Sequence, residues 1–106
     1  MKKKLVLKIG TSTLTSGTKL ISRGKIEDIG RQILELRDEY DIVLVSSGAI
    51  AAAKQYINIK DSGKPVESKQ AMAAIGQPLL MRIYNEVFSD FGIPTAQCLM
   101  TYRDFE

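Results

Sequence analysis

Histidine and tryptophan are absent from this 106-residue sequence, and cysteine occurs only once, as Cys98. Without histidine these residues cannot form a Ser-His pair for nucleophilic catalysis, and the Gly-x-Ser-x-Gly motif is absent as well. A single cysteine excludes a disulfide bond within the chain and fits a protein kept reduced in the cytoplasm. We expect Cys98 to be a small buried apolar residue.

Long apolar runs and strong charge are also lacking. No run approaches the ~20 apolar residues that a membrane-spanning helix needs. The opening MKKKLVLKIG has an apolar part of only about four residues, against roughly 7–15 in a signal peptide. The formal net charge is +3, and the three Phe and four Tyr are scattered, which is a weak signal for nucleic-acid binding. We therefore expect a protein that binds neither membranes nor nucleic acid.

The sequence does contain an alternation of apolar strands with helical patterns. Residues 5–10 (LVLKIG) and 42–45 (IVLV) are continuous apolar runs, typical of strands covered on both faces. Residues 95–100 (TAQCLM) predict a third strand, after a turn at Gly92 and Pro94. This order predicts an α/β fold in which a parallel sheet is sandwiched by helices.

Helices are expected between these strands. Ser22 is a candidate cap for the first helix, and residues 46–56 (SSGAIAAAKQY) predict a turn into an alanine-rich helix. Residues 57–67 predict a surface loop, after which Ser68 caps a pattern that contains Pro78. Because proline is poorly tolerated inside a helix, this last region predicts two helices or one kinked helix. The apolar face of the first helix consists of Ile26, Ile29, Ile33 and Leu36.

The loop after the first predicted strand has the composition of a phosphate site. Gly10 lets the backbone approach a ligand closely, and the amides of Gly10, Thr11 and Ser12 can converge on an anion. Lys8 can extend a positive charge to the same place. Neither the P-loop pattern nor Gly-x-Gly-x-x-Gly is present. The simpler interpretation, a solvated lysine before a hydroxyl-rich surface turn, therefore stays open.

The loop after the second predicted strand, SSGA at 46–49, is a strand-to-helix junction. In parallel sheets ligands bind at the carboxyl ends of the strands, where both of these loops are expected. Free amides at the start of a helix, here near Ser47 and Gly48, favour a carboxylate or a phosphate. The alternative is that Ser47 only caps the helix.

Four segments together resemble the amino acid kinase family, over essentially the whole chain. KIGTSTLT is shared by several kinases of that family, whereas SSGAIAA followed by KQAMAAIGQ is more specific to its members that phosphorylate glutamate. Ala53 stands where the pattern of those members has glycine. The segments are KIGTSTLT (8–15), VLVSSGAIAAA (43–53), SKQAMAAIGQPLLMRIYNEVF (68–88) and GIPTAQCLMTYRDFE (92–106).

The resemblance implies ATP-dependent phosphorylation of the side-chain carboxylate of L-glutamate to L-glutamyl 5-phosphate, the first step of proline biosynthesis. A carboxylate is ionised at neutral pH and needs no general base, which fits the absence of histidine. The implied roles are Lys8 as the catalytic residue, Lys8, Gly10, Thr11 and Ser12 around the ATP phosphates, and Ser47, Gly48 and Ala49 around glutamate.

The implied cofactors are ATP and Mg²⁺, although no metal ligand can be named. The implied partners are L-glutamate and further copies of the chain in a homo-oligomer, with proline as a feedback inhibitor. The family's catalytic domain is much longer than 106 residues. We therefore expect residues 1–106 to be the N-terminal, glutamate-binding part of an amino acid kinase domain, without its nucleotide-binding half. Such a chain is either a fragment or the product of a truncated reading frame.

Two other functions stay open. One is that of another amino acid kinase, acting on acetylglutamate, aspartate, carbamate or a small phosphorylated alcohol. The other is a non-catalytic module that supplies an oligomer contact, because the helical region around residues 79–91 has more apolar side chains than one face can bury.

Overall fold

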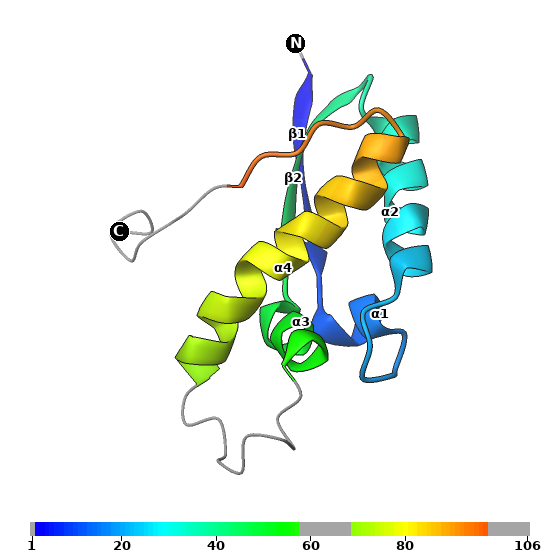
Figure 1. Ribbon diagram of the computed structural model, residues 1–106. Coiled ribbons are helices and arrows are strands. Elements are labelled where there is room, and N and C mark those ends of the chain that lie inside the picture. Colours follow the sequence, from blue (N-terminus) through cyan, green and yellow to red (C-terminus); the bar gives the residue numbers. More distant parts are fainter. Residues whose placement is uncertain (1, 58–68, 98–106) are drawn as a thin grey trace, which may run out of the picture.

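The computed structural model describes residues 2–57 and 69–97. In this part of the chain two strands lie against a set of helices (Figure 1). The elements in chain order are β1 (Lys3–Ile9), α1 (Thr11–Thr15), α2 (Arg23–Leu36), β2 (Tyr40–Ser46), α3 (Ala49–Tyr56) and α4 (Lys69–Asp90). The predicted α/β class and the parallel strand pairing are confirmed.

The two strands run in the same direction and end at the same level. Their pairing begins with Lys3 opposite Tyr40 and ends with Ile9 opposite Ser46. The connection between them passes through α1 and α2, as a parallel pair requires a crossover. Both carboxyl ends therefore lie at one edge of the sheet, next to α1 and α3 (Figure 1).

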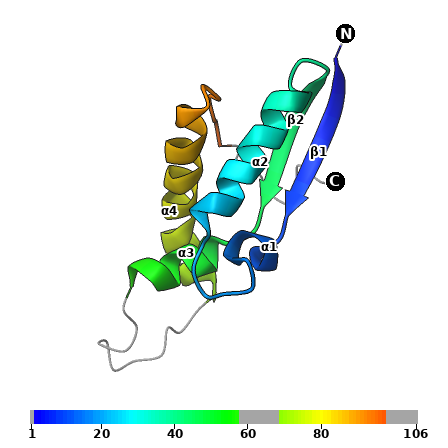
Figure 2. The same cartoon turned by 90° about the vertical axis from the view of Figure 1, so that its right-hand side faces the viewer.

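One face of the sheet is covered by helices. Figure 2 shows α2 and α4 on the same side of the two strands. On the opposite face Val6, Val43 and Val45 are 63%, 50% and 48% exposed. Within the described residues the strands are thus covered on one face, and not on both as their apolar runs predict. The strand residues that pack against the core are Leu7, Ile9, Ile42 and Leu44.

α2 forms where the apolar periodicity predicts it. Ser22 caps the helix, because its side-chain Oγ accepts a hydrogen bond of 3.1 Å from the backbone N–H of Lys25. The helix ends at Leu36, which is half-buried. The predicted apolar face is buried, with exposed fractions of 0%, 6% and 6% at Ile26, Ile29 and Ile33.

α4 continues through Pro78 as one helix, so the alternative of two helices is wrong. Proline has no N–H for the carbonyl four residues earlier, and inside a helix this costs about 3 kcal/mol. Pro78 and Ala74 are both exposed, so water can hydrogen-bond to the carbonyl of Ala74. On its other side α4 packs tightly on α3, because a Cβ built on Gly76 would overlap the carbonyl oxygen of Ala49. None of the described helices is both long enough and apolar enough to cross a membrane.

The predicted third strand does not appear in the residues that the structure describes. Residues 95–97 have no regular structure, and residues 98–100 lie outside the described ranges. The Thr95 hydroxyl donates a hydrogen bond of 3.1 Å to Oδ1 of Asn85 on α4. Within residues 95–97, this contact is with a helix. The predictions for Cys98, for Ser68 as a cap and for the loop at 58–67 also lie outside the described residues.

Candidate functional site

The two loops that the sequence singles out meet at the carboxyl edge of the sheet. Ile9 and Ser46 are the last paired residues of β1 and β2. Beyond them the N–H of Ser47 donates a hydrogen bond of 2.8 Å to the carbonyl of Ile9. The prediction that both loops lie at one edge is therefore confirmed.

The first loop is partly helical, which the sequence analysis did not predict. Gly10 is the N-cap of the five-residue helix α1, and the N–H of Leu14 donates to its carbonyl at 3.1 Å. The hydroxyl of the buried Thr15 donates to the carbonyl of Thr11 at 3.0 Å, which holds this short helix together. Gly10 has φ −84°, which any residue can adopt, and a Cβ there would find no heavy atom within 4 Å. Neither conformation nor packing thus requires glycine at this position.

The second loop does require its glycine. Gly48 is the N-cap of α3 with φ +114°, in the left-handed region that favours glycine. A Cβ at Gly48 would also approach Cδ1 of the fully buried Leu14 to 2.8 Å. The N–H of Ala52 donates to the Gly48 carbonyl at 2.9 Å, and no side chain caps the helix. Ser47 is therefore not the helix cap, and its exposed side chain is available for another contact.

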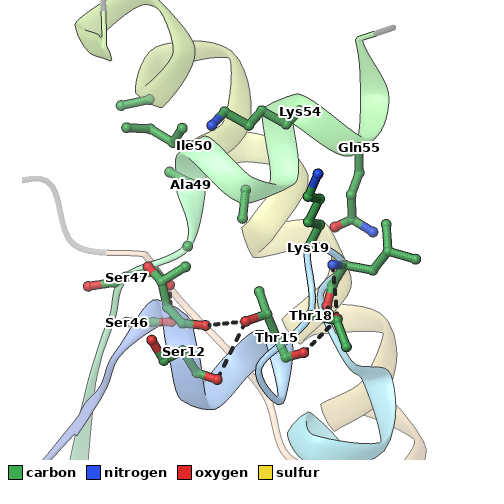
Figure 3. A pocket seen from close by; sticks show the side chains of 15 residues that line it. Ser12, Thr15, Thr18, Lys19, Ser46, Ser47, Ala49, Ile50, Lys54 and Gln55 are labelled. Atoms are coloured by element: carbon green, nitrogen blue, oxygen red, sulfur yellow. Dashed lines mark hydrogen bonds between the residues drawn. The ribbon is translucent and has the colours of Figure 1, made fainter.

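The loops enclose one side of an open cavity of about 950 Å³ (Figure 3). This volume lies within the range of small-molecule sites, roughly 300–1,000 Å³. Lys8 and Gly10 do not line the cavity; Lys8 is exposed in β1, opposite Val45. The predicted site residues that line it are Thr11, Ser12, Ser47, Gly48 and Ala49.

The opposite side of the cavity consists of residues that the sequence analysis missed. They come from the segment after α1 and from the far end of α3 (Figure 3). The N–H of Ile21 donates to Oε1 of Gln55 at 3.2 Å, which holds the two segments together. The sequence does hold a signal for two of them. Residues four apart share a helix face, so Lys54 and Gln55 lie on the same face of α3 as the cavity-lining Ile50 and Ala51. The polar lining residues on this side are Thr18, Lys19, Lys54 and Gln55, and two further missed residues, Thr15 of α1 and Ser46 of β2, line the cavity beside the two loops.

The charge of this cavity has one sign. Lys19 and Lys54 are its only charged lining residues among those described, and both are exposed. Figure 3 shows their side chains beside α3, although they start from different segments. Together with the amides at the start of α3, they favour an anionic ligand. Across residues 2–57 and 69–97, no three Asp, Glu, Cys or His side chains come together as a metal site.

Comparison with known proteins identifies several similar sequences. Three relatives, each named Glutamate 5-kinase, come from Helicobacter hepaticus, Thermus thermophilus and Dehalococcoides mccartyi. The chain is 45% identical to the first over 105 residues, which is 99% of this chain and 39% of the relative. It is 45% and 47% identical to the other two over 103 residues each, which is 96% of this chain and 28% of each relative. The chain thus spans less than half the length of the relatives it matches.

A family model adds the classification. The model described as "Amino acid kinase family" matches residues 3–106, which is nearly every position. The parallel strand pair and the two loops at its carboxyl edge both lie within the matched range. The chain belongs to the amino acid kinase family.

Proposed function

We propose that this chain is the N-terminal, glutamate-binding part of an enzyme that phosphorylates the side-chain carboxylate of L-glutamate with ATP. The product is L-glutamyl 5-phosphate, and the reaction is the first step of proline biosynthesis. The observation that carries the proposal is the cavity at the carboxyl edge, lined by Ser47, Gly48 and Ala49 and by no described carboxylate. The name Glutamate 5-kinase on the three relatives supports the same substrate.

The glutamate end of the site is assigned to the turn 47–49. The hydroxyl of Ser47 is exposed and does not cap α3, so it can donate to a carboxylate. The first amides of α3 lack intrahelical acceptors and lie at the positive end of the helix. Lys54 adds a positive charge on the cavity wall.

The phosphate end is assigned to Lys8, Gly10, Thr11 and Ser12. Thr11 and Ser12 line the same cavity as the glutamate turn. The open space beside Gly10, which nothing in the fold requires to be glycine, supports close approach of a ligand to this backbone. Lys8 stands two residues before that glycine at the end of β1, and we assign it the catalytic contact with the transferred phosphoryl group.

The reaction needs positioning and charge stabilisation. An oxygen of the glutamate side-chain carboxylate forms a bond to the terminal phosphorus of ATP, and the bond from that phosphorus to ADP breaks. The acceptor is already ionised, so no proton has to be removed from it. Mg²⁺, the implied metal, supplies positive charge to the phosphate oxygens. No described residues form a cluster that would hold it, so we assign it no ligand.

The test uses the complete enzyme, meaning a protein that contains these residues and has the full length of the relatives. ADP release with MgATP should depend on L-glutamate, and hydroxylamine should trap the acyl phosphate as a hydroxamate. A panel of acetylglutamate, aspartate and carbamate separates the other amino acid kinase activities. Preference for any of these over L-glutamate would contradict the proposal.

The remaining assignments are part of the same proposal. We infer a cytoplasmic enzyme, which the single cysteine supports. We infer a homo-oligomer, supported by Ile75 on α4, which is 42% exposed. Proline is proposed as the feedback inhibitor, and its effect is measured by adding it to the same assay. The mass of the 106-residue chain in solution and its response to ATP test the alternative of a non-catalytic module that supplies an oligomer contact.

A further inference from the structure

A line of hydroxyl groups runs from the core to the turn at the carboxyl edge. The Tyr84 hydroxyl on α4 lies 2.8 Å from the Oγ of Ser46, the last residue of β2. The Ser46 hydroxyl in turn donates a hydrogen bond of 2.8 Å to the carbonyl of Ser47. Tyr84 does not line the cavity and is only 3% exposed, whereas Ser46 and Ser47 line it.

The direction of these bonds follows from counting protons. A serine hydroxyl has one hydrogen, and that of Ser46 is used toward the Ser47 carbonyl. Tyr84 must therefore donate to the Ser46 Oγ. Burial raises the pKa of Tyr84 above its usual value. The phenol consequently keeps its proton at neutral pH and remains a donor.

This chain of bonds fixes the peptide unit that opens the turn. The N–H of Ser47 is held by the carbonyl of Ile9, and the carbonyl of Ser47 is held by the Ser46 hydroxyl. The Ser47 carbonyl and the Gly48 N–H belong to one planar peptide unit, so fixing the first fixes the direction of the second. Gly48 has φ +114°, and glycine can adopt a wide range of backbone angles. Without these hydrogen bonds, the direction of the Gly48 N–H would be less constrained.

The anchor of this line is rigid. The Tyr84 ring packs edge-on against Phe88, with centroids 5.4 Å apart and an interplanar angle of 73°. α4 itself is held against α3 by the backbone contact of Gly76 with Ala49. The Tyr84 hydroxyl therefore has little freedom to follow a moving turn.

We propose that Tyr84 is a positioning residue that orients the anion-binding turn 47–49 through Ser46. This inference rests on the proposed role of that turn in holding the glutamate carboxylate. Tyr84 touches no substrate in this scheme. It acts by setting the direction of the Ser47–Gly48 peptide before the ligand arrives, which lowers the cost of ordering the turn on binding.

Tyr84→Phe in the complete enzyme tests the proposal, because it removes the hydroxyl and keeps the ring. We expect the KM for glutamate to rise about three- to tenfold, as for the loss of one neutral hydrogen bond, with the KM for ATP and kcat changed less than about twofold. Ser46→Ala should give a similar rise. The double variant should be no worse than the stronger single one, since both break the same line.

Hydrogen–deuterium exchange without ligand gives a readout that does not depend on the reaction. The amides of residues 47–49 should exchange faster in Tyr84→Phe, while those of α2 remain unchanged. Tyr40→Phe is the matched control, because Tyr40 lies at the opposite end of β2 and does not line the cavity. It should alter neither exchange in the turn nor the KM for glutamate.

The outcomes separate this inference from the proposed function. A wild-type enzyme that does not phosphorylate glutamate would overturn the proposed function. Hydrogen–deuterium exchange at residues 47–49 would still decide whether Tyr84 orders the turn. An active wild-type enzyme whose Tyr84→Phe variant shows normal exchange and a normal glutamate KM would overturn the positioning role alone. A uniform loss of thermal stability with both KM values unchanged would reduce Tyr84 to a packing residue.

Discussion

Ser47 is the residue whose role the structure narrows most. The sequence leaves it as either a helix cap or a ligand contact, and the cap position belongs to Gly48. Its side chain is exposed at the cavity, while its backbone N–H and carbonyl are both hydrogen-bonded. The hydroxyl is therefore the part of Ser47 that is positioned for a ligand.

Ser47→Ala in the complete enzyme should raise the KM for glutamate from a few-fold to about tenfold, which is the loss of one neutral hydrogen bond. The backbone bonds of the turn stay in place, so the KM for ATP should hardly change. Steady-state kinetics with each substrate varied in turn measure both constants. A selective rise in the KM for ATP would mean that the two loops have been assigned in reverse.

Lys54 is a second residue with a testable charge effect. It lines the cavity from α3, but it is exposed, so screening limits its contribution. We expect Lys54→Gln to raise the KM for glutamate about two- to fivefold at low ionic strength, with less effect as salt is added. Lys3→Gln is the matched control, because Lys3 is an exposed lysine at the amino end of β1. Equal effects of the two substitutions would show that only the net charge of the protein matters.

Lys8 should affect the chemical step more than binding. A cation at the transferred phosphoryl group stabilises the transition state more than the ground state, so its loss lowers kcat. Lys8→Met keeps most of the side-chain volume and should cost about 10²–10³ in kcat, whereas Lys8→Arg should restore little. Circular dichroism and an unchanged oligomer mass establish that the variants are folded. A folded Lys8→Met enzyme with near-normal kcat would identify Lys8 as a solvated strand-end charge.

At the scale of elements, the packing of α3 on α4 decides where the turn 47–49 lies. The first residue of α3, Ala49, both lines the cavity and contacts Gly76 of α4 through its carbonyl. Ala53 is fully buried one turn further along α3. A Cβ built on Gly76 would lie 3.0 Å from the backbone nitrogen of Ala53. The small side chains at these positions let the two helix backbones approach closely.

Gly76→Ala should therefore separate the two helices. Overpacking costs about 1–3 kcal/mol, and the better helix propensity of alanine offsets about 1 kcal/mol of it. Because the added Cβ meets backbone atoms, we expect the upper end, a net loss of about 2 kcal/mol in the free energy of unfolding measured with urea. Gly24→Ala on α2 is the control, since its Cβ would meet only the Ser22 Oγ at 3.7 Å. Equal unfolding midpoints for wild type and Gly76→Ala would contradict the close packing.

The comparison of sequence with structure separates local from tertiary information. The cap at Ser22 and the buried face of α2 depend on neighbours within a few residues, and the sequence predicts both. Lys19 reaches the cavity because a loop folds onto Gln55, and no short-range pattern encodes that contact. Gly48, and not Ser47, occupies the cap position of α3, and this depends on the positive φ of Gly48 and on the Leu14 side chain packed against it. Such features require the assembled fold.

At the scale of the whole molecule, the described residues leave sheet edges unpaired and a cavity open, as expected for only part of a kinase domain. The sheet has two strands, and their outer edges have no partner among residues 2–57 and 69–97. On its second face the apolar side chains of Val6, Val43 and Val45 are exposed, beside charged residues such as Lys8. The cavity is lined by residues of two loops and by two lysines, and none of the described residues that line it has a carboxylate that could bind a metal ion.

These surfaces lead to the prediction that the 106-residue chain alone has no kinase activity. The phosphates of ATP need a metal ion or several cations, and no metal cluster is found in the described ranges. The chain spans 28–39% of the length of the three relatives described above, so we expect the nucleotide site to depend on residues beyond these. Purified chain with L-glutamate and MgATP should release no ADP above background, while the complete enzyme does so under the same conditions. Circular dichroism and the mass in solution establish that the short chain is folded and report its oligomeric state. Sustained glutamate-dependent turnover by the 106 residues alone would show that the phosphate loop and the cavity already form a working nucleotide site, and the division into two halves would be wrong.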